Sequence, residues 1–318
     1  MIGGVSVSES VELASCADPY PSRVGQSSAI LTRLDPVVHS QSFEGGPIPR
    51  HLVDEYEERG FLVLENMFTP LEVRSLQEEV ALLQENHRHA DNETCIAEPG
   101  GHTLRSIFAV HKSASSFARL ACDRRLVELA QFLLGDEVYI HQSRLNFKPG
   151  FRGKEFYWHS DFETWHVEDG MPRMRALSMS ITLTENMANN GPLMLIPGSH
   201  KHYVACSGQT PENHFQESLR KQEYGVPSDE LLLGLANEGG VFSADAQPGS
   251  VIVFDCNTMH GSNSNITPYP RSNAFIVYNS LQNQVVVPYC ERPPRPEFIC
   301  TRSAIEPITI REGGISSG

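Results

Sequence analysis

Two segments of the chain carry hydrophobic residues every three to four positions, which is the period of an amphipathic helix. The first begins at Thr69-Pro70-Leu71-Glu72, which combines an N-cap, a proline at the first helical position and a capping-box glutamate. The apolar residues that follow at helical spacing are Val73, Leu76, Val80 and Leu83. We expect this helix to run to about Asn86. A second helix is predicted from the cap Asp123 to Gly135, with Leu126, Leu129, Ala130 and Leu133 on one face.

After Gly135 the apolar period changes to two, which is the period of a strand. The predicted strands cover residues 137–148, 176–184, 192–196, 249–255 and 272–281. Gly/Pro turns such as Asn190-Gly191-Pro192 and Pro248-Gly249 separate several of them, which favours antiparallel connections. We therefore expect a mainly β protein with flanking helices, whose core is a double-stranded β-helix of the jelly-roll, cupin-like type.

The distribution of apolar and polar residues also predicts where the domain begins and ends. Residues 1–45 are rich in Ser, Gly and Pro and predict a flexible N-terminal arm. Residues 46–300 are expected to form a single jelly-roll domain with an N-terminal helical layer and a polar, partly helical insertion at about 201–247. The chain from Val285 is proline-rich and predicts an extended segment over the surface, followed by a C-terminal tail at 301–318.

The strand at 137–148 carries a polar stripe. Gln142, Arg144, Asn146 and Lys148 alternate with apolar residues and so project from one face. The solvent side of a sheet gives the same pattern. The position just before the sequence F-Y-W-H-S-D favours a functional role.

Composition narrows the classes of partner. The chain has 39 acidic and 25 basic residues and a formal net charge of −14, which disfavours nucleic acid and anionic membranes as partners. Its seven cysteines are scattered without a C-x-x-C pair, which indicates a reducing compartment. The chain shows neither a signal-peptide pattern nor an apolar run long enough to span a bilayer, so we expect a cytoplasmic protein.

Three H-x-[D/E] pairs are candidate metal chelates, although chance alone gives roughly 1.6 in a chain of this composition. His89/Asp91 lies in a polar run and predicts a solvated loop. His166/Glu168 leads into Asp169-Gly170-Met171-Pro172 and predicts a loop after a strand. His159/Asp161 follows an aromatic strand-forming run, which makes it the strongest of the three.

His260 is a plausible third ligand, because it follows the apolar strand Val251-Ile252-Val253-Phe254. Two histidines and one carboxylate bind a metal such as Fe(II) on one face and leave positions open, as in non-haem iron oxygenases. Arg271 lies eleven positions later at the start of the next strand, where a guanidinium can hold a dicarboxylate.

These motifs carry a family resemblance over about residues 50 to 300. H-S-D, the distal His260, Arg271 and G-P-L-M-L-I-P-G-S-H resemble the Fe(II)/2-oxoglutarate-dependent dioxygenases of the phytanoyl-CoA hydroxylase type. More narrowly, H-Q-S-R-L-N-F-K-P followed by F-Y-W-H-S-D-F-E-T-W-H-V-E-D-G-M-P resembles the ectoine hydroxylases. The resemblance implies a jelly-roll enzyme that uses Fe(II), 2-oxoglutarate and O₂ to hydroxylate ectoine, releasing succinate and CO₂.

The resemblance also implies roles for residues. His159, Asp161 and His260 would be the catalytic metal ligands. The co-substrate 2-oxoglutarate would be held by Arg271 and Lys148, with Ser262, Asn146 and Phe156 close by. The substrate site would include Gln142, Trp165, Phe275, Arg144, Thr164 and Asn273. A tryptophan face attracts a delocalised cation such as that of ectoine. Ordinary core packing is the alternative for Trp165 and Phe275.

Two stretches near these residues are given no chemistry. Ser178, Ser180 and Thr182 alternate with apolar residues and are interpreted as plain sheet patterning, and residues 197–200 as a turn. Two other functions remain open: the same chemistry on another small zwitterion such as proline or on an acyl conjugate, and a cupin-like protein that binds metal or solute without turnover. A homodimer is compatible with the predicted sheet edges and the 201–247 insertion.

Overall fold

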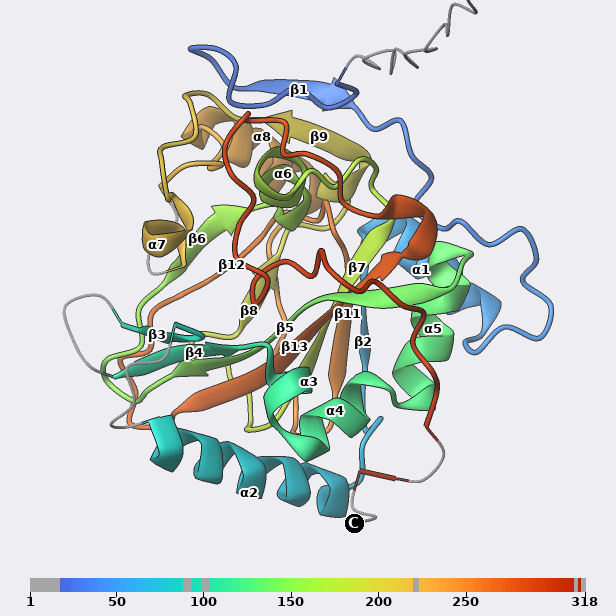
Figure 1. Ribbon diagram of the computed structural model, residues 1–318, viewed down its shortest axis with the longest axis vertical. Helices are drawn as coiled ribbons and strands as arrows, with labels where there is room; N and C mark the ends of the chain where they lie inside the picture. The colour runs from blue at the N-terminus through green and yellow to red at the C-terminus, as the bar shows by residue number, and fades with distance from the viewer. Residues whose placement is uncertain (1–17, 88–92, 99–102, 220–222, 312–313, 316–318) are drawn as a thin grey trace, which may run out of the picture.

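The computed structural model describes residues 18–87, 93–98, 103–219, 223–311 and 314–315. Two antiparallel sheets form its centre, and helices cover one of them (Figure 1). The larger sheet has the strand order β2-β11-β7-β13-β5-β4-β3, and the smaller has the order β10-β8-β12-β6. A separate pair, β1-β9, lies at the opposite end of the molecule from helix α2 (Figure 1). The predicted double-stranded β-helix is confirmed.

The strands agree closely with the period-two segments. Their bounds are β1 (Ala29–Thr32), β2 (Phe61–Leu64), β3 (Cys95–Ala97), β4 (Leu104–Phe108), β5 (Val138–Lys148), β6 (Phe156–His159), β7 (Ala176–Thr182), β8 (Leu193–Leu195), β9 (His202–Ala205), β10 (Phe242–Ser243), β11 (Val251–Asp255), β12 (His260–Ser262) and β13 (Arg271–Ser280). All five predicted strands are therefore present, as β5, β7, β8, β11 and β13.

The helices are α1 (Arg50–Arg59), α2 (Pro70–His87), α3 (Val110–Ser113), α4 (Ser115–Ala121), α5 (Arg124–Leu134), α6 (Asp161–Thr164), α7 (Phe215–Ser218) and α8 (Asp229–Gly239). Short helical turns lie at η1 (Trp165–Asp169), η2 (Ser199–Lys201) and η3 (Leu281–Asn283). Both predicted helices form with their caps. Thr69 and Glu72 bond to each other's backbone N–H groups at the start of α2, Asp123 accepts from Arg125 N, and Gly135 ends α5 in the left-handed conformation.

The alternation of residues on the strands separates two cores. Val251 and Val253 of β11 pack with α2 and α5 on the outer face of the large sheet, where Leu76 and Leu126 are fully buried. Ile252 and Phe254 point the other way and meet Leu193 and Leu195 of the small sheet. The helical layer thus closes one face of the large sheet, and the space between the two sheets is left for the site.

The N-terminal segment departs from the prediction. Residues 1–17 lie outside the described residues, and within 18–45 parts of the predicted arm are packed against the domain. Tyr20 and Arg23 are buried, and β1 pairs with β9 from Ala29 opposite Ala205 to Thr32 opposite His202. The sequence did not predict this packing because a few large side chains fix the segment, and they leave no periodic pattern among the Ser, Gly and Pro residues.

The 201–247 insertion and the C-terminal segment are also packed. The described part of the insertion contains β9, α7, α8 and β10, which agrees with a partly helical excursion. The prediction of a surface segment after Val285 is wrong in part, because Arg295, Ile299 and Cys300 are buried. The backbone N–H of Thr301 donates to the carbonyl of His141, so this segment lies against β5.

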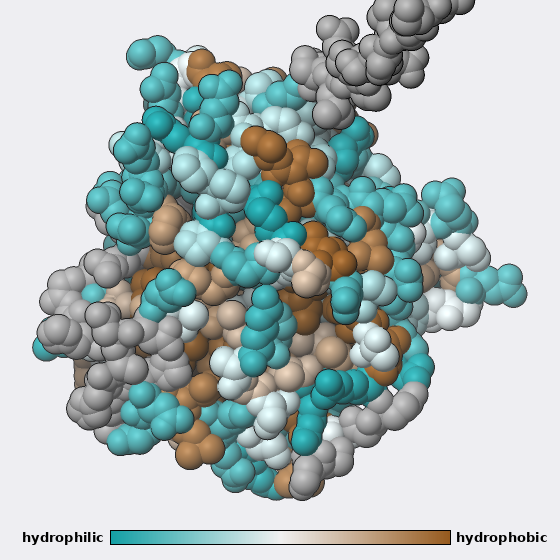
Figure 2. Space-filling view, viewed as in Figure 1, coloured by the Kyte–Doolittle hydropathy of each residue, from teal (hydrophilic) through white to brown (hydrophobic). Residues whose placement is uncertain are grey.

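Hydrophilic residues predominate on much of the face drawn in Figure 2, and its apolar residues gather in separate patches. Among the described residues, none of the helices has the length and apolar character that a membrane crossing requires.

Candidate active site

Three potential metal ligands converge where the small sheet meets α6. His159 ends β6, His260 begins β12, and the two residues are directly paired across these strands. Asp161 is the first residue of α6, which Ser160 caps. The Nε2 atoms of His159 and His260 lie 3.8 and 3.9 Å from Oδ1 of Asp161. All three residues are buried, and their ligand atoms lie within 4.8 Å of one another. This geometry fits one ion held on a single face.

Backbone carbonyls orient both imidazoles. Nδ1 of His159 donates to the carbonyl of Tyr157 at 2.7 Å, and Nδ1 of His260 donates to the carbonyl of Thr258 at 2.9 Å. Because a carbonyl can only accept, the proton stands on Nδ1 and the Nε2 lone pair faces Asp161. Burial, together with His260, lowers the pKa of His159 to about 3, so this ring is neutral at pH 7. Neutral imidazole is the form that binds a metal.

The carboxylate of Asp161 is held in its charged form. Burial alone would raise its pKa, but His260, His159 and Arg144 outweigh that effect and the pKa is lowered. The hydroxyl of Ser178 on β7 donates to Oδ2 at 3.1 Å, which leaves Oδ1 on the side of the imidazoles. The donor set of two imidazoles and one carboxylate suits Fe(II).

Cationic side chains lie beside the metal ligands on the inner face of the large sheet. Lys148 and Arg271 are paired across β5 and β13, and both are buried. Nε and Nη1 of Arg271 have no hydrogen-bond partner within the described part of the chain. Burial, followed by Arg105 and Arg144, lowers the pKa of Arg271 to about 9. A buried guanidinium without a partner is costly unless an anion binds it.

A small cavity connects the cations with the metal ligands. Its lining residues are Arg144, Asn146, Phe156, His159, Leu193, His260, Gly261, Ser262, Arg271 and Phe275. Asn146 faces Asn273 across β5 and β13, and Phe275 faces Arg144. The guanidinium of Arg144 stands 5.0 Å from the ring centroid of Phe275. The cavity therefore brings together eight residues that the sequence predicted for the site.

Residues 56–273 match the family model described as phytanoyl-CoA dioxygenase (PhyH), which covers more than half of the chain. The chain belongs to the phytanoyl-CoA dioxygenase family. Relatives named ectoine dioxygenase extend this similarity. One from Stutzerimonas stutzeri is 53% identical over 295 residues, covering 93% of this chain and 98% of the relative. Another from Halomonas elongata is 46% identical over 284 residues, covering 89% and 85%.

Solved structures agree with this PhyH-family assignment. EctD from S. alaskensis with 2-oxoglutarate and 5-hydroxyectoine is 48% identical, with a TM-score of 0.86 over 94% of this chain and 99% of that chain. The same protein with bound Fe has a TM-score of 0.84 over the same shares. The carbocyclase SnoK from nogalamycin biosynthesis, at 18% identity and a TM-score of 0.58 over 84% of this chain and 95% of that chain, shares the fold.

Several predicted site residues of this PhyH-family chain are not among the residues that line the cavity. Nε2 of Gln142 donates to the carbonyl of Ile299, and Nδ2 of Asn273 donates to Ser180 Oγ at 3.0 Å. Nζ of Lys148 donates to the carbonyl of Lys154, and burial, followed by Arg271 and Arg105, lowers its pKa to about 6. Thr164 and Trp165 are buried on α6 and η1, and Trp165 lies in an apolar cluster with Phe162 and Val277.

Sequence reasoning missed some residues that support the site. The Ser178/Ser180/Thr182 stripe is more than sheet patterning, because Ser178 bonds Asp161 and Ser180 bonds Asn273. A run of hydroxyls facing inward on a predicted strand was the available signal. The guanidinium of Arg105 lies 4.8 Å from the centroid of the Phe156 ring and pairs with Glu98. The local sequence of β4 does not predict either contact.

One loop prediction is wrong. His166 and Glu168 lie in the buried helical turn η1, where His166 bonds Asp18 and Glu168 bonds Arg23. The Gly170-Met171-Pro172 signal marks the end of this turn, and the left-handed Gly170 stops it. The pair His89/Asp91 lies outside the described residues.

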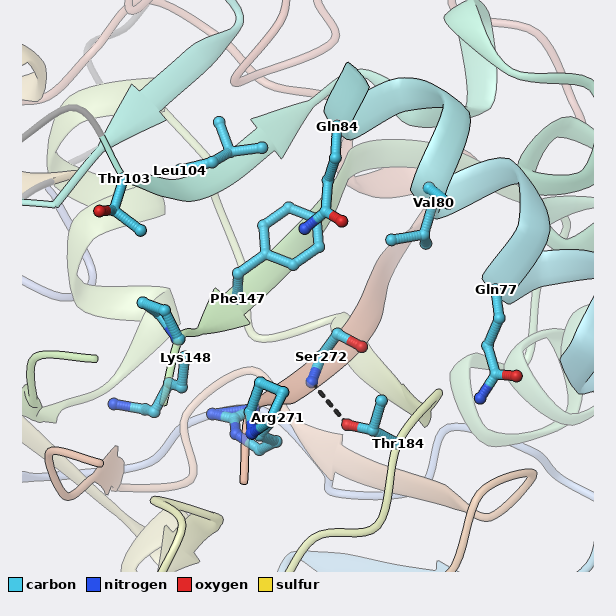
Figure 3. Close-up of a pocket in the computed structure, with 13 residues that line it drawn as sticks. Gln77, Val80, Gln84, Thr103, Leu104, Phe147, Lys148, Thr184, Arg271 and Ser272 are labelled. Carbon is cyan, nitrogen blue, oxygen red and sulfur yellow. Dashed lines mark hydrogen bonds between the residues drawn. The ribbon is translucent and has the colours of Figure 1, made fainter. Parts of the chain in front are cut away.

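A second, wider pocket lies beside the β5-β13 pair, and Lys148 and Arg271 are among the residues that line it (Figure 3). Val80 and Gln84 of α2 line it together with Leu104 of β4 and Phe147 of β5. These side chains offer packing and amide contacts without a metal-binding set. A second potential ligand cluster, His141–Asp169–Cys300, lies elsewhere, but Arg295 already pairs with both oxygens of Asp169. That guanidinium occupies the position that a cation would need.

Proposed function

We propose that this chain is an Fe(II)- and 2-oxoglutarate-dependent dioxygenase that hydroxylates ectoine to 5-hydroxyectoine and releases succinate and CO₂. The buried His159–Asp161–His260 cluster carries the proposal, together with Arg271, whose Nε and Nη1 are buried without a hydrogen-bond partner in the described residues. Such a pair of sites suits a metal and a dicarboxylate bound next to each other. The full-length similarity to ectoine dioxygenases supports ectoine as the substrate.

His159, Asp161 and His260 would hold the iron through Nε2, a carboxylate oxygen and Nε2. When bound, the iron with 2-oxoglutarate and O₂ supplies the oxidising chemistry that places one oxygen atom on the substrate. The chain keeps the two Nε2 lone pairs exposed to the metal through the Tyr157 and Thr258 carbonyls. Ser178 keeps the Asp161 carboxylate turned toward them.

Arg271 and Lys148 would hold the distal carboxylate of 2-oxoglutarate, with Ser262, Asn146 and Phe156 around its carbon chain. A dianion placed there gives the Arg271 guanidinium the hydrogen-bond partner that it lacks. It also offsets the repulsion by which Arg105 and Arg144 lower the pKa of Arg271 and by which Arg271 lowers the pKa of Lys148.

Ectoine would lie beyond the metal. Trp165 would present an aromatic face to its delocalised cation, which contributes about 2 kcal/mol when desolvated. Arg144 would attract its carboxylate, while Gln142, Thr164 and Asn273 would provide polar contacts and Phe275 an apolar wall. Arg144 is half-buried, and its buried Nε has no hydrogen-bond partner in the described residues, which suits an anionic ligand group.

The decisive experiment measures succinate release with purified protein, Fe(II), 2-oxoglutarate and ectoine. We expect release that requires both iron and ectoine, with 5-hydroxyectoine formed in equal amount, and loss of both products in His159→Ala. A panel with proline and other small zwitterions tests the substrate. Equal coupling with proline would refute ectoine as the substrate, and bound metal without 2-oxoglutarate consumption on any substrate would refute catalysis.

We also propose that the enzyme works in the cytoplasm and forms a homodimer. The six cysteines within the described residues are all free, which supports a reducing compartment. The small sheet ends in β10 and β6, so strand edges are available for pairing. Light scattering of the purified protein measures the mass, and a monomer at micromolar concentration would contradict the second proposal.

A further inference from the structure

The segment from Asp161 to Asp169 joins the proposed metal site to the proposed substrate wall. Its first residue is the carboxylate ligand Asp161, and Thr164 and Trp165 follow on the same short helical stretch. Its other ionisable side chains are Glu163, His166, Glu168 and Asp169, all of them buried. Each pairs with a residue near one end of the chain: Glu163 and Glu168 with Arg23, His166 with Asp18, and Asp169 with Arg295.

Arg23 makes the largest set of these contacts. Its Nε and Nη2 donate to the two carboxylate oxygens of Glu163 at 3.0 and 2.7 Å, which is a bidentate arrangement. Its Nη1 donates to Glu168 Oε1 at 2.5 Å. Only 1% of the Arg23 side chain is exposed. Burial alone would lower its pKa, but Glu163 and Glu168 outweigh burial and raise it, so the guanidinium is permanently charged.

The same guanidinium touches the proposed substrate wall directly. Nη2 of Arg23 donates to Thr164 Oγ1 at 3.3 Å, and Thr164 immediately precedes Trp165. The hydroxyl of Thr164 points in turn toward Oε2 of Glu163 at 3.5 Å. One planar group thus fixes side chains at the start, the middle and the end of the segment.

The backbone of Arg23 is itself anchored. Its N–H donates to the carbonyl of Cys206 at 2.8 Å, and the N–H of Cys206 donates back to Ser22 Oγ at 2.8 Å. Ser22 Oγ donates onward to Glu163 Oε1 at 2.6 Å. Cys206 directly follows β9, which pairs with β1, so the guanidinium is held from a rigid sheet and not from a free arm.

We propose that Arg23 is a positioning residue for substrate binding: it fixes the Asp161–Asp169 segment so that Trp165 presents its ring to the substrate. This inference rests on the proposed function, because it assigns Trp165 to the ectoine site. A guanidinium is required because it neutralises two buried carboxylates at once and bonds both oxygens of one of them. Without the guanidinium, Glu163 loses its cationic partner and Glu168 keeps only His214, so the segment must move or take up protons.

The test uses a readout that does not depend on turnover. Trp158 and Trp165 are the two tryptophans of the chain, so Trp158→Phe leaves Trp165 as the single emitter. In that background, Arg23→Lys keeps the charge but removes the bidentate fork. We expect a red-shifted Trp165 emission and stronger quenching by acrylamide. In the otherwise native enzyme we expect a rise of about ten- to a hundredfold in KM for ectoine, with KM for 2-oxoglutarate changed by less than about twofold.

Arg125→Lys is the matched control. Arg125 also bonds two carboxylates, those of Asp123 and Glu72, but at the junction of α2 and α5. We expect this variant to lower the melting temperature and to leave Trp165 emission and KM for ectoine as in the parent. If Arg23→Lys does not fold, Glu163→Gln provides the same readouts, since it replaces the charged carboxylate with a neutral amide of the same shape.

The outcomes separate the two proposals. A parent enzyme that does not turn over ectoine refutes the proposed function, whereas the Trp165 emission still tests Arg23. An active parent whose Arg23→Lys variant loses thermal stability, as Arg125→Lys does, but keeps the parent's Trp165 quenching and KM for ectoine, refutes the positioning role. Glu163→Gln is held to the same criteria.

Discussion

Replacing Ser178 with alanine removes one hydrogen bond from the carboxylate that we propose binds iron. The Ser178 hydroxyl donates to Oδ2 of Asp161 at 3.1 Å, and both side chains are buried. Alanine leaves Oδ2 without this donor in a space that water cannot readily fill, because Ser178 is 1% exposed. The carboxylate then becomes free to rotate away from the orientation in which Oδ1 faces the two imidazoles.

The magnitude follows from the charge of the acceptor. A hydrogen bond to a charged group contributes about 1.5–3 kcal/mol. Since about 1.4 kcal/mol corresponds to tenfold in an equilibrium constant, Ser178→Ala is expected to weaken Fe(II) binding by about ten- to a hundredfold. The same range is typical for the loss of a residue that orients a metal ligand.

Anaerobic calorimetric titration of the metal-free protein with Fe(II) measures this change. Ser180→Ala is the control, because Ser180 lies on the same face of β7 but bonds Asn273 and not a proposed ligand. We expect Ser180→Ala to keep the parent's metal affinity within about twofold. Equal Fe(II) affinities for Ser178→Ala and Ser180→Ala would refute the orienting role of Ser178.

Further predictions concern the co-substrate site. Arg271→Met removes the partnerless guanidinium and should raise KM for 2-oxoglutarate by about ten- to a hundredfold, since charge-assisted bonds contribute about 1.5–3 kcal/mol; an unchanged KM would contradict the anchor role. Lys148, whose pKa is about 6, is largely neutral at pH 8, and a bound dianion favours its charged form. Binding should therefore take up a proton and weaken as the pH rises above about 6. Titrations at several pH values test this, and Lys148→Met should remove the dependence. The same depressed pKa means that the unfolded state binds more protons above about pH 6, so Lys148 should make stability increase with pH there. Chemical denaturation of Lys148→Met, compared with the parent, measures that slope.

The strands and the metal ligands could be predicted because their signals are local. An alternating pattern fixes which side of β5, β11 and β13 faces the helices, and this alternation survives in the structure. His159 and His260 were proposed as ligands on different strands of one jelly roll, and in the structure they are paired across β6 and β12. Arg271 was found through its position at the start of β13, where it faces Lys148.

The supporting contacts could not be predicted because they join distant parts of the chain. Arg23, which bonds Glu163, lies 140 positions away from it in a segment without periodicity. The burial of Gln142 against Ile299 is of the same kind. Side-chain fit between remote segments depends on the assembled fold, and neither propensity nor spacing contains it.

Residues near both ends of the chain bond the Asp161–Asp169 segment, and this affects where the boundaries of the catalytic domain lie. A fragment trimmed to the matched residues 56–273 would lose Arg23, Asp18 and Arg295 together. The buried carboxylates of Glu163, Glu168 and Asp169 would lose their arginine partners, and only Glu168 and Asp169 would keep a histidine, His214 and His141, beside them. The region matched by the family model is thus smaller than the domain that folds as one unit. The terminal segments belong to the catalytic domain although their sequences show no periodic pattern.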